Sequence, residues 1–291
     1  MTPDTADILI EALPYIRRFK GMTLVVKYGG HAMVDEQLKA DFARDVTLLK
    51  YVGLHPIIVH GGGPQINQVL DQMGISARFV RGMRMTDALT MDVVEMVLGG
   101  KVNKAVVANI NQQGGQAVGL SGKDGGLLLA QKLKIIFDDG GETPPEIIDP
   151  GHVGEVTAVK PAILETLSQK GFIPVISPVG ADENGATYNI NADHVAAKIA
   201  VALSARRLVY LTDVDGVLDD KGQLVSTIDQ EAIRRMIDNE TIKGGMIPKI
   251  ECAVMALTQG VGKVPIINGK IRHALLLELF TRQGIGTEVV A

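Results

Sequence analysis

Two glycine clusters in this 291-residue chain directly follow apolar runs rich in β-branched residues. The run at 23–28 carries Lys27 and ends at Gly29-Gly30, and the run at 56–60 ends at Gly61–Gly63. Such runs are typical of buried parallel strands that turn into helices, and glycine at the turn lets backbone N–H groups approach an anion. Because helix N-termini add positive charge there, the two turns and the strand-end lysine predict a phosphate-binding site. Taken singly, either cluster is equally typical of an ordinary short strand-to-helix connection.

Three polar motifs in the second half of the chain could complete such a site. They are Asn189–Asp193 before a helical pattern, Thr212–Val217 after an apolar run, and Gly244–Lys249 at a helix start. Each has a structural explanation of its own: a helix cap at Asn191 or Asp193, an ordinary loop, and a solvated lysine. In combination they supply the cations, amides and carboxylate that phosphoryl transfer needs around a γ-phosphoryl group.

The sequence lacks the common nucleotide-binding signatures. No spaced glycine is followed by Gly-Lys-Ser/Thr, the protein-kinase motifs are missing, and neither glycine cluster fits Gly-x-Gly-x-x-Gly after a strand. A nucleotide would therefore be bound by a different loop architecture.

Alternating helical and strand patterns must position these motifs. Helices are expected at 7–19, 35–52, 65–73, 90–111, 161–171, 191–205, 229–238 and 246–259, and strands at 23–28, 56–60, 78–85, 116–120, 173–177, 207–212 and 264–268. The turn at 182–185 predicts a hairpin, and the turn-rich segment 132–150 an insertion or a second hairpin. The order indicates an α/β fold with one doubly wound, mainly parallel central sheet and helices on both faces, whose strand ends line one crevice.

Composition excludes several other classes of protein. Hydrophobic residues make up 46% of the chain and charged residues 21%, so a large core can be buried. The formal net charge of −4, the 4% of aromatic residues and the absence of tryptophan give no basis for nucleic-acid binding. The single Cys252 permits neither an intrachain disulfide nor a cysteine-cluster metal site. With no signal peptide and no apolar run long enough to cross a membrane, a soluble, cytoplasmic protein is expected.

Six motifs resemble, in order, those of the amino acid kinase superfamily. They span the chain from about Gly21 to Thr287 and are Lys27–Gly30, His60–Pro64, Arg81–Thr86, Asn189–Asp193, Thr212–Val217 and Gly244–Lys249. The glycine turns are shared across the superfamily, which includes carbamate, glutamate, aspartate and UMP kinases. The motifs at 81–86 and 189–193 are narrower and resemble those of the N-acetylglutamate kinases. Tyr28 departs from the smaller or aliphatic residue of many relatives, and its role is not indicated.

The resemblance implies attack of the γ-carboxylate of N-acetyl-L-glutamate on the γ-phosphate of ATP, with Mg²⁺ carried by ATP and no protein metal site. Lys27 and Lys249 would stabilise the transferring phosphoryl group, and Asp193 would orient both lysines. The other implied roles are phosphate binding by Gly29, Gly30 and Gly62; substrate binding by Gly62, Gly63, Arg84 and Asn189; and nucleotide binding by Asp213, Val214, Asp215, Gly216, Val217, Leu218, Thr241, Ile242 and Lys243.

The resemblance also implies an N-terminal helical extension (1–20), a lobe for acetylglutamate binding and dimerisation (21–180) and a nucleotide-binding lobe (181–291). The helix at 7–19 is explained as a cover for a sheet edge of its own subunit, or as an extension interlaced between dimers in a hexamer, a trimer of dimers. The C-terminal run resembles the effector region of arginine-inhibited members, although helical packing of its leucines explains it equally well. The implied effector residues for inhibitory arginine are Lys198, His273, Glu278 and Gly284.

Two alternatives stay open. A sibling kinase for another carboxylate substrate would keep both lysines and both glycine turns, but would have no need of Arg84 and Asn189. A non-catalytic amino-acid sensor on the same fold would have no need of Lys27, Asp193 and Lys249 together.

Overall fold

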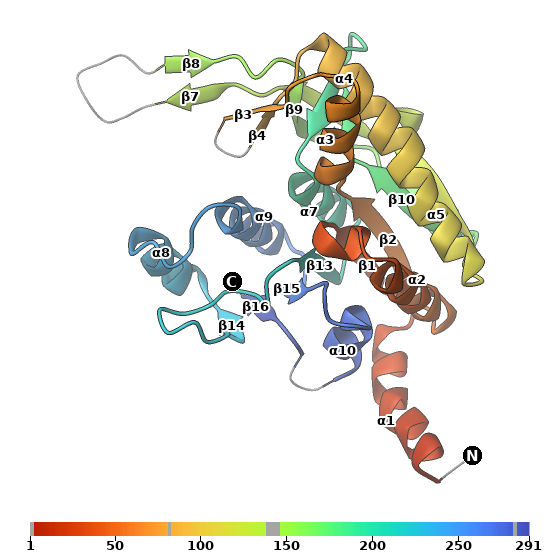
Figure 1. Cartoon of the computed structure of the whole chain (residues 1–291). Helices are drawn as coiled ribbons and strands as arrows, with labels where there is room; N and C mark the ends of the chain where they lie inside the picture. The colour runs from red at the N-terminus through yellow and green to blue at the C-terminus, as the bar shows by residue number, and fades with distance from the viewer. Residues whose placement is uncertain (1–2, 81–82, 138–145, 282–283, 291) are drawn as a thin grey trace.

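The chain forms an α/β fold around an eight-stranded sheet (Figure 1). The computed structural model describes residues 3–80, 83–137, 146–281 and 284–290. In spatial order the strands are β14 (Thr227–Ile228), β16 (Thr287–Val289), β15 (Val264–Asn268), β13 (Arg207–Thr212), β1 (Thr23–Tyr28), β2 (His55–His60), β10 (Ile173–Ser177) and β5 (Ala117–Ser121). All neighbours in this sheet are parallel except β15 and β16, which confirms the expected doubly wound, mainly parallel sheet.

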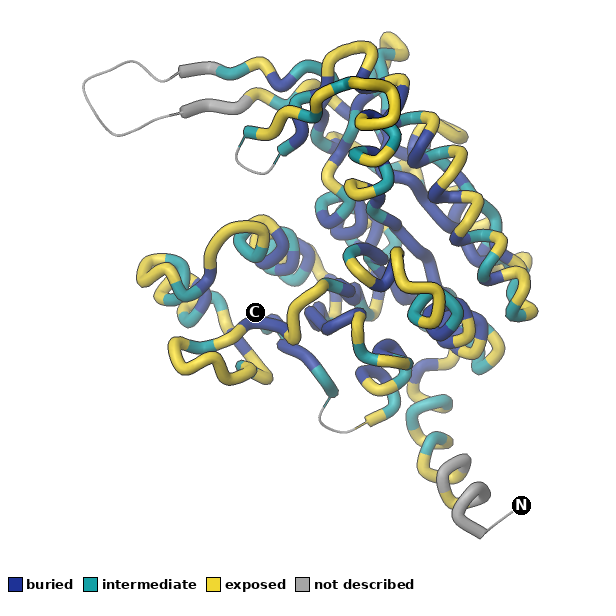
Figure 2. Tube along the Cα trace, viewed as in Figure 1, coloured by how far each residue is buried: buried dark blue, intermediate teal, exposed yellow. Residues whose placement is uncertain are grey.

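Two apolar layers cover the two faces of the sheet. Successive side chains of β1 alternate between them: Val26 packs with Leu49 and Ile110, whereas Val25 packs with Ile199 and Ile250. Because both faces are covered, the central strands are buried along almost their whole length (Figure 2). The helices are α1 (Pro3–Phe19), α2 (Glu36–Tyr51), α3 (Gly63–Gln72), α4 (Ala88–Glu95), α5 (Asn103–Gln112), α6 (Ala162–Gln169), α7 (Ala192–Ala202), α8 (Gln230–Asp238), α9 (Met246–Thr258) and α10 (Ala274–Phe280). No helix of the described chain is both long and apolar enough to span a bilayer.

A second, smaller sheet was not expected from the sequence. It closes on itself and contains β6 (Leu128–Lys132), β9 (Val153–Val159), β11 (Val179–Ala181) and β12 (Thr187–Ile190). Antiparallel β11 and β12 flank the turn at 182–185 and confirm the hairpin expected there. The sheet matters for the site because β12 ends at Ile190, immediately before α7.

Two further hairpins differ from or refine the expected elements. The single strand expected at 78–85 is instead an antiparallel pair, β3 (Arg78–Val80) and β4 (Met83–Met85); Arg81 and Gly82 of the motif lie outside the described residues. The segment 132–150 contains the pair β7 (Ile135–Phe137) and β8 (Glu146–Ile148), which extends from the end of the molecule that carries α3 and α4 (Figure 1).

The long helix expected at 90–111 contains a change of helical type. Between α4 and α5, residues Met96–Val102 form a π-helical segment, η2, which includes Gly99 and Gly100. Helical backbone thus continues from Ala88 to Gln112, with a widened turn at the glycine pair.

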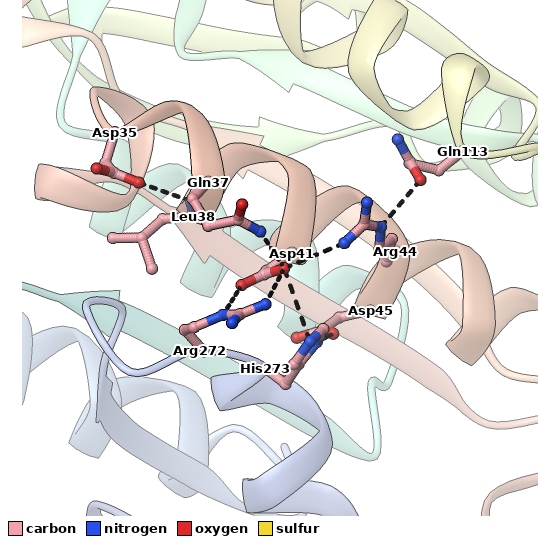
Figure 3. A network of polar contacts seen from close by, with 9 residues as sticks. All are labelled: Asp35, Gln37, Leu38, Asp41, Arg44, Asp45, Gln113, Arg272 and His273. Atoms are coloured by element: carbon pink, nitrogen blue, oxygen red, sulfur yellow. Dashed lines mark hydrogen bonds and ion pairs between the residues drawn. The ribbon is translucent and has the colours of Figure 1, made fainter.

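A polar network ties the segment before α10 to α2 (Figure 3). Asp41 and Asp45 lie one helical turn apart on α2, and both are buried. Arg272 donates from Nε to Asp41 Oδ2 at 2.7 Å, and His273 Nδ1 lies 2.6 Å from Asp45 Oδ1. Arg44 makes a longer contact of 3.5 Å to Asp41 Oδ1. Two buried carboxylates are therefore matched by cationic or hydrogen-bonding groups, as burial of charge requires.

The two carboxylates have opposite pKa shifts. The hydrogen bond from Arg272 lowers the pKa of Asp41 against the effect of burial. Burial raises the pKa of Asp45 to about 6, and the charge of Asp41 adds to this, although His273 acts in the opposite direction. Asp45 therefore carries a proton more readily in the folded chain than in the unfolded chain.

Replacing Asp45 by asparagine should remove one source of pH dependence from the free energy of unfolding. Because the folded-state pKa of about 6 lies above the ordinary value of about 4, Asp45 stabilises the fold fully below pH 4 and loses this contribution as the pH rises through 6. Relative to Asp45→Asn, we expect the free energy of unfolding of the unaltered protein to fall by up to about 3 kcal/mol between pH 4 and 7.

Urea denaturation of both proteins at several pH values measures this difference. Asp220→Asn, which changes an exposed carboxylate, is the control. Parallel pH dependences of the unaltered protein and Asp45→Asn would contradict the assignment.

Candidate active site

The glycine turn after β1 and the polar loop after β13 meet at the carboxyl edge of the sheet. The strands are parallel neighbours, with Lys27 opposite Tyr210. The backbone N–H of His31 donates to the Asp213 carboxylate, which joins the two loops. Gly30 has φ +72°, and a Cβ there would collide with Asp213. Strand order changes direction between β1 and β13, and ligands of open α/β sheets bind at such a point.

Lys27, Asp193 and Lys249 come together above this edge from β1, α7 and α9. Lys249 Nζ donates to Asp193 Oδ2 at 2.7 Å, and Lys27 Nζ lies 3.1 Å from Asp193 Oδ1 as an ion pair without hydrogen-bond alignment. Asp193 and Lys249 are buried, and Lys27 is half-buried. Asn191 caps α7 by accepting from the backbone N–H of Asp193 at 2.8 Å, so the cap and the carboxylate are separate functions.

The three charges give the site a net positive charge. Burial alone would raise the pKa of Asp193, but the charges of Lys27 and Lys249 and the hydrogen bond from Lys249 outweigh it and hold that pKa below its usual range. Burial lowers the pKa of Lys249, and Asp193 opposes this shift. An ionised carboxylate between two ammonium groups leaves one positive charge, which suits a phosphoryl group.

At both turns, other side chains lie so close to the glycine that a Cβ would displace them. A Cβ on Gly29 would lie 2.7 Å from Lys27 Nζ, and a Cβ on Gly62 would meet the side chain of Leu98. The N–H of Gly61 donates to the carbonyl of Tyr28 at 2.8 Å and so joins the second turn to the first. Gly62 and Gly63 open α3, where backbone N–H groups have no partner within the helix. The two glycine turns therefore leave room for phosphate oxygens, and larger residues at Gly29 and Gly62 would take up that room.

Arg84 on β4 is buried beside the second glycine turn. Its Nη2 donates to the Gly63 carbonyl at 3.3 Å and to the side chain of Asn67, and its guanidinium lies 4.8 Å from the Phe79 ring centroid. Its Nη1 is buried and has no hydrogen-bond partner within the described chain. Burial lowers the pKa of Arg84, and an unpaired guanidinium nitrogen in such a place calls for an anionic acceptor.

Sequence reasoning missed two polar residues that support this region. Thr86 is buried and accepts from Asn189 Nδ2 at 3.4 Å, which brings the end of β4 to β12. Asn103 is buried and donates from Nδ2 to the Val175 carbonyl at 2.9 Å, with His60 Nε2 at 3.2 Å. Thr86 stands within a quoted motif, whereas Asn103 gives no signal in the sequence because it lies inside a helical pattern.

The residues expected to bind nucleotide differ in how far they are exposed to solvent. Asp213, Val214, Asp215 and Leu218 are exposed in the loop after β13, and Lys243 is exposed before α9. Thr241 is half-buried, and Gly216 is buried against Thr287, which also accepts from the Val217 N–H at 2.8 Å. The side chains of Val217 and Ile242 belong to the core, and their backbone N–H groups are already bonded within the chain, that of Val217 to Thr287 and that of Ile242 to the Met236 carbonyl.

The four residues expected to hold arginine are also divided. Glu278 and Gly284 line a cavity of about 780 Å³, together with Tyr15 and Phe19 of α1. His273 does not line this cavity, because it turns toward Asp45 of α2. Lys198 lies on α7 and does not line it either. Other residues around the cavity supply cations and anions: Arg18, Arg207, Lys263 and Glu288.

Known proteins of one family resemble the chain over almost its whole length. Residues 22–268 match the amino acid kinase family. The acetylglutamate kinase of Syntrophobacter fumaroxidans is 57% identical over 99% of this chain and 96% of its own, and that of Geotalea uraniireducens is 59% identical over 99% and 98%.

Solved structures of the same fold include larger proteins. The N-acetylglutamate synthase of Neisseria gonorrhoeae complexed with coenzyme A and N-acetyl-glutamate has a TM-score of 0.85 at 28% identity over 98% of this chain. This chain spans 63% of that synthase. A complex with coenzyme A and L-arginine has a TM-score of 0.81 at 26% identity, over 98% of this chain and 65% of the synthase. The match over residues 22–268 and the relatives at 57% and 59% identity show that the chain belongs to the amino acid kinase family.

Proposed function

We propose that this chain transfers the γ-phosphate of ATP to the γ-carboxylate of N-acetyl-L-glutamate, giving N-acetylglutamyl 5-phosphate for arginine biosynthesis. Two observations carry the proposal: the cationic site at Lys27, Asp193 and Lys249, and a buried guanidinium nitrogen of Arg84 that has no hydrogen-bond partner among the described residues. Relatives that are 53–59% identical over nearly the whole chain and are named acetylglutamate kinase support this substrate.

The chemical step needs positive charge more than it needs a base. A carboxylate nucleophile is already ionised near pH 7, and the transferring group carries negative charge on three oxygens. Lys27 and Lys249 stabilise that charge, Asp193 keeps both ammonium groups in place, and the N–H groups of Gly29, Gly30 and Gly62 bind phosphate oxygens. Mg²⁺ bound to the ATP phosphates would supply further charge neutralisation.

Arg84 binds the α-carboxylate of the substrate. Its Nη2 is held by the Gly63 carbonyl, so the buried Nη1 is the nitrogen left for the ligand. Asn189 and the turn at Gly62-Gly63 bind the rest of N-acetylglutamate. The nucleotide lies along the loops 213–218 and 241–243. In this proposal the chain consists of the extension 1–20, a substrate-binding lobe at 21–180 and a nucleotide-binding lobe at 181–291.

The test is MgATP-dependent acyl phosphate formation, trapped with hydroxylamine. We expect N-acetylglutamate to be turned over far faster than glutamate or aspartate, and Lys27→Ala and Lys249→Ala each to lose about 3–4 kcal/mol of transition-state stabilisation, a fall in kcat of two to three orders of magnitude. Preference for glutamate or aspartate would identify a sibling kinase. No turnover of any acceptor would favour the amino-acid sensor, and near-normal kcat in either lysine variant would remove that lysine from the mechanism.

Arg84→Lys should mainly raise KM for N-acetylglutamate. A lysine ammonium cannot hold the Gly63 carbonyl and a carboxylate in the planar geometry of a guanidinium, so we expect KM to rise about tenfold or more with a smaller change in kcat. Steady-state kinetics with each substrate varied in turn measures both constants. An unchanged KM for N-acetylglutamate, with KM for ATP raised, would move the substrate carboxylate away from Arg84.

We propose that arginine inhibits the enzyme by binding in the cavity that residues of α1 and of the segment 278–288 line together. Glu278 offers a carboxylate for the arginine guanidinium, and Glu278 Oε2 already accepts from the Ile285 N–H at 2.9 Å. The similar synthase complexed with L-arginine supports this ligand. The extension 1–20 contributes Tyr15 and Phe19 to the cavity, and in this proposal it also interlaces dimers into a hexamer.

Glu278→Gln should weaken arginine inhibition, because the charge that faces the guanidinium is lost. We expect the arginine concentration for half inhibition to rise about tenfold or more, measured against each variant's own uninhibited rate. Because burial raises the pKa of Glu278, inhibition should also weaken as the pH falls through that raised value.

A variant that begins at Gly21 should lose arginine inhibition, whereas Lys198→Ala should keep it. The reverse pattern would place the arginine site near α7.

A further inference from the structure

Tyr210 contacts two members of the charged cluster without belonging to it. Its hydroxyl donates to the backbone carbonyl of Asp193 at 3.1 Å. The ring centroid lies 5.9 Å from Lys249 Nζ. On the neighbouring strand, Lys27 stands opposite Tyr210 in the β1–β13 register. One side chain of β13 thus lies beside all three residues of the cluster.

The environment of Tyr210 keeps it a neutral donor. Tyr210 is completely buried, and burial, with the negative charge of Asp193 adding to it, raises the pKa of its phenol well above the usual value. A buried hydroxyl needs a partner, and here the partner is the carbonyl at the start of α7. The hydrogen bond therefore ties the start of α7 to strand β13 of the sheet. It thereby helps to hold the Asp193 carboxylate in position.

The ring contributes to the electrostatics of Lys249. The groups that face this ammonium are Asp193 of α7, Lys27 of β1, Cys252 of α9 and the Tyr210 ring of β13. Asp193 favours the charged form, whereas Lys27 and burial oppose it. An aromatic face near a desolvated ammonium adds attraction that an aliphatic side chain cannot supply.

We propose that Tyr210 is a positioning residue of the phosphoryl-transfer site: its hydroxyl holds the Asp193 backbone, and its ring supports the charged ammonium of Lys249. The catalytic part of this inference rests on the proposed function. Its structural part, the coupling of Tyr210 to Lys249, does not.

Tyr210→Phe and Tyr210→Leu separate the two contributions. Tyr210→Phe removes the hydroxyl and keeps the ring, and we expect kcat to fall about fivefold, with KM for both substrates within about twofold of normal. Tyr210→Leu also removes the ring and should move the alkaline limb of the kcat–pH profile about half a unit lower, whereas Tyr210→Phe should leave it in place. Tyr51→Phe, which removes a phenol-to-carbonyl hydrogen bond of 2.9 Å to Gly114, is the matched control.

A second measurement is independent of turnover. The pH dependence of Lys249 acetylation by acetic anhydride, followed by peptide mass spectrometry, should have a lower midpoint in Tyr210→Leu than in Tyr210→Phe and the unaltered chain. Tyr210→Met replaces Tyr210→Leu where the leucine variant does not fold. Normal kcat in Tyr210→Phe, or an unchanged Lys249 midpoint in the aliphatic variant, would overturn the proposal. Absence of acyl phosphate in the unaltered chain would reject the proposed function and leave the acetylation result to decide the coupling.

Discussion

A buried carboxylate between two ammonium groups is the constraint on which the rest of the structure depends. Asp193 would be costly to bury alone, and its two lysines come from elements far away in the sequence. The sheet must therefore hold β1 in register with β13, and α7 and α9 must lie side by side on the same face. Completing this electrostatic cluster thus requires the correct packing of both halves of the chain.

Most of the central sheet could be predicted because its strands have the signature of parallel strands covered on both faces; β14 and β16, with two and three residues, were not expected. β1, β2 and β10 are short continuous apolar runs, and helical periodicity follows or precedes them. Apart from the β11–β12 hairpin, the second sheet could not be predicted, because its strands have three to seven residues and its other pairings join strands far apart in the sequence. The pattern at 78–85 likewise carried no clear sign of the reversal between β3 and β4.

The site was predictable where residue type and spacing both carry information. Glycine turns, the helix-starting Lys249 and the motif that contains Asp193 are local signals, and the fold brings them together. Which residues the expected effector side chains contact was not predictable. His273 pairs with Asp45, and Lys198 lies apart from the cavity that Glu278 lines. The role proposed for Tyr210 could not be predicted for another reason: an aromatic residue in a buried strand is typical of an ordinary hydrophobic core.

The placement of β16 has a consequence for the order of assembly during synthesis. This strand, Thr287–Val289, lies between β14 and β15 and pairs with both. Until residues 287–289 have left the ribosome, the two-residue β14 cannot join the sheet through β16, and one edge of β15 presents a row of unpaired backbone groups. Such an open edge is a template for pairing with another chain, so the nascent protein is exposed to aggregation for as long as β16 has not yet paired with β15.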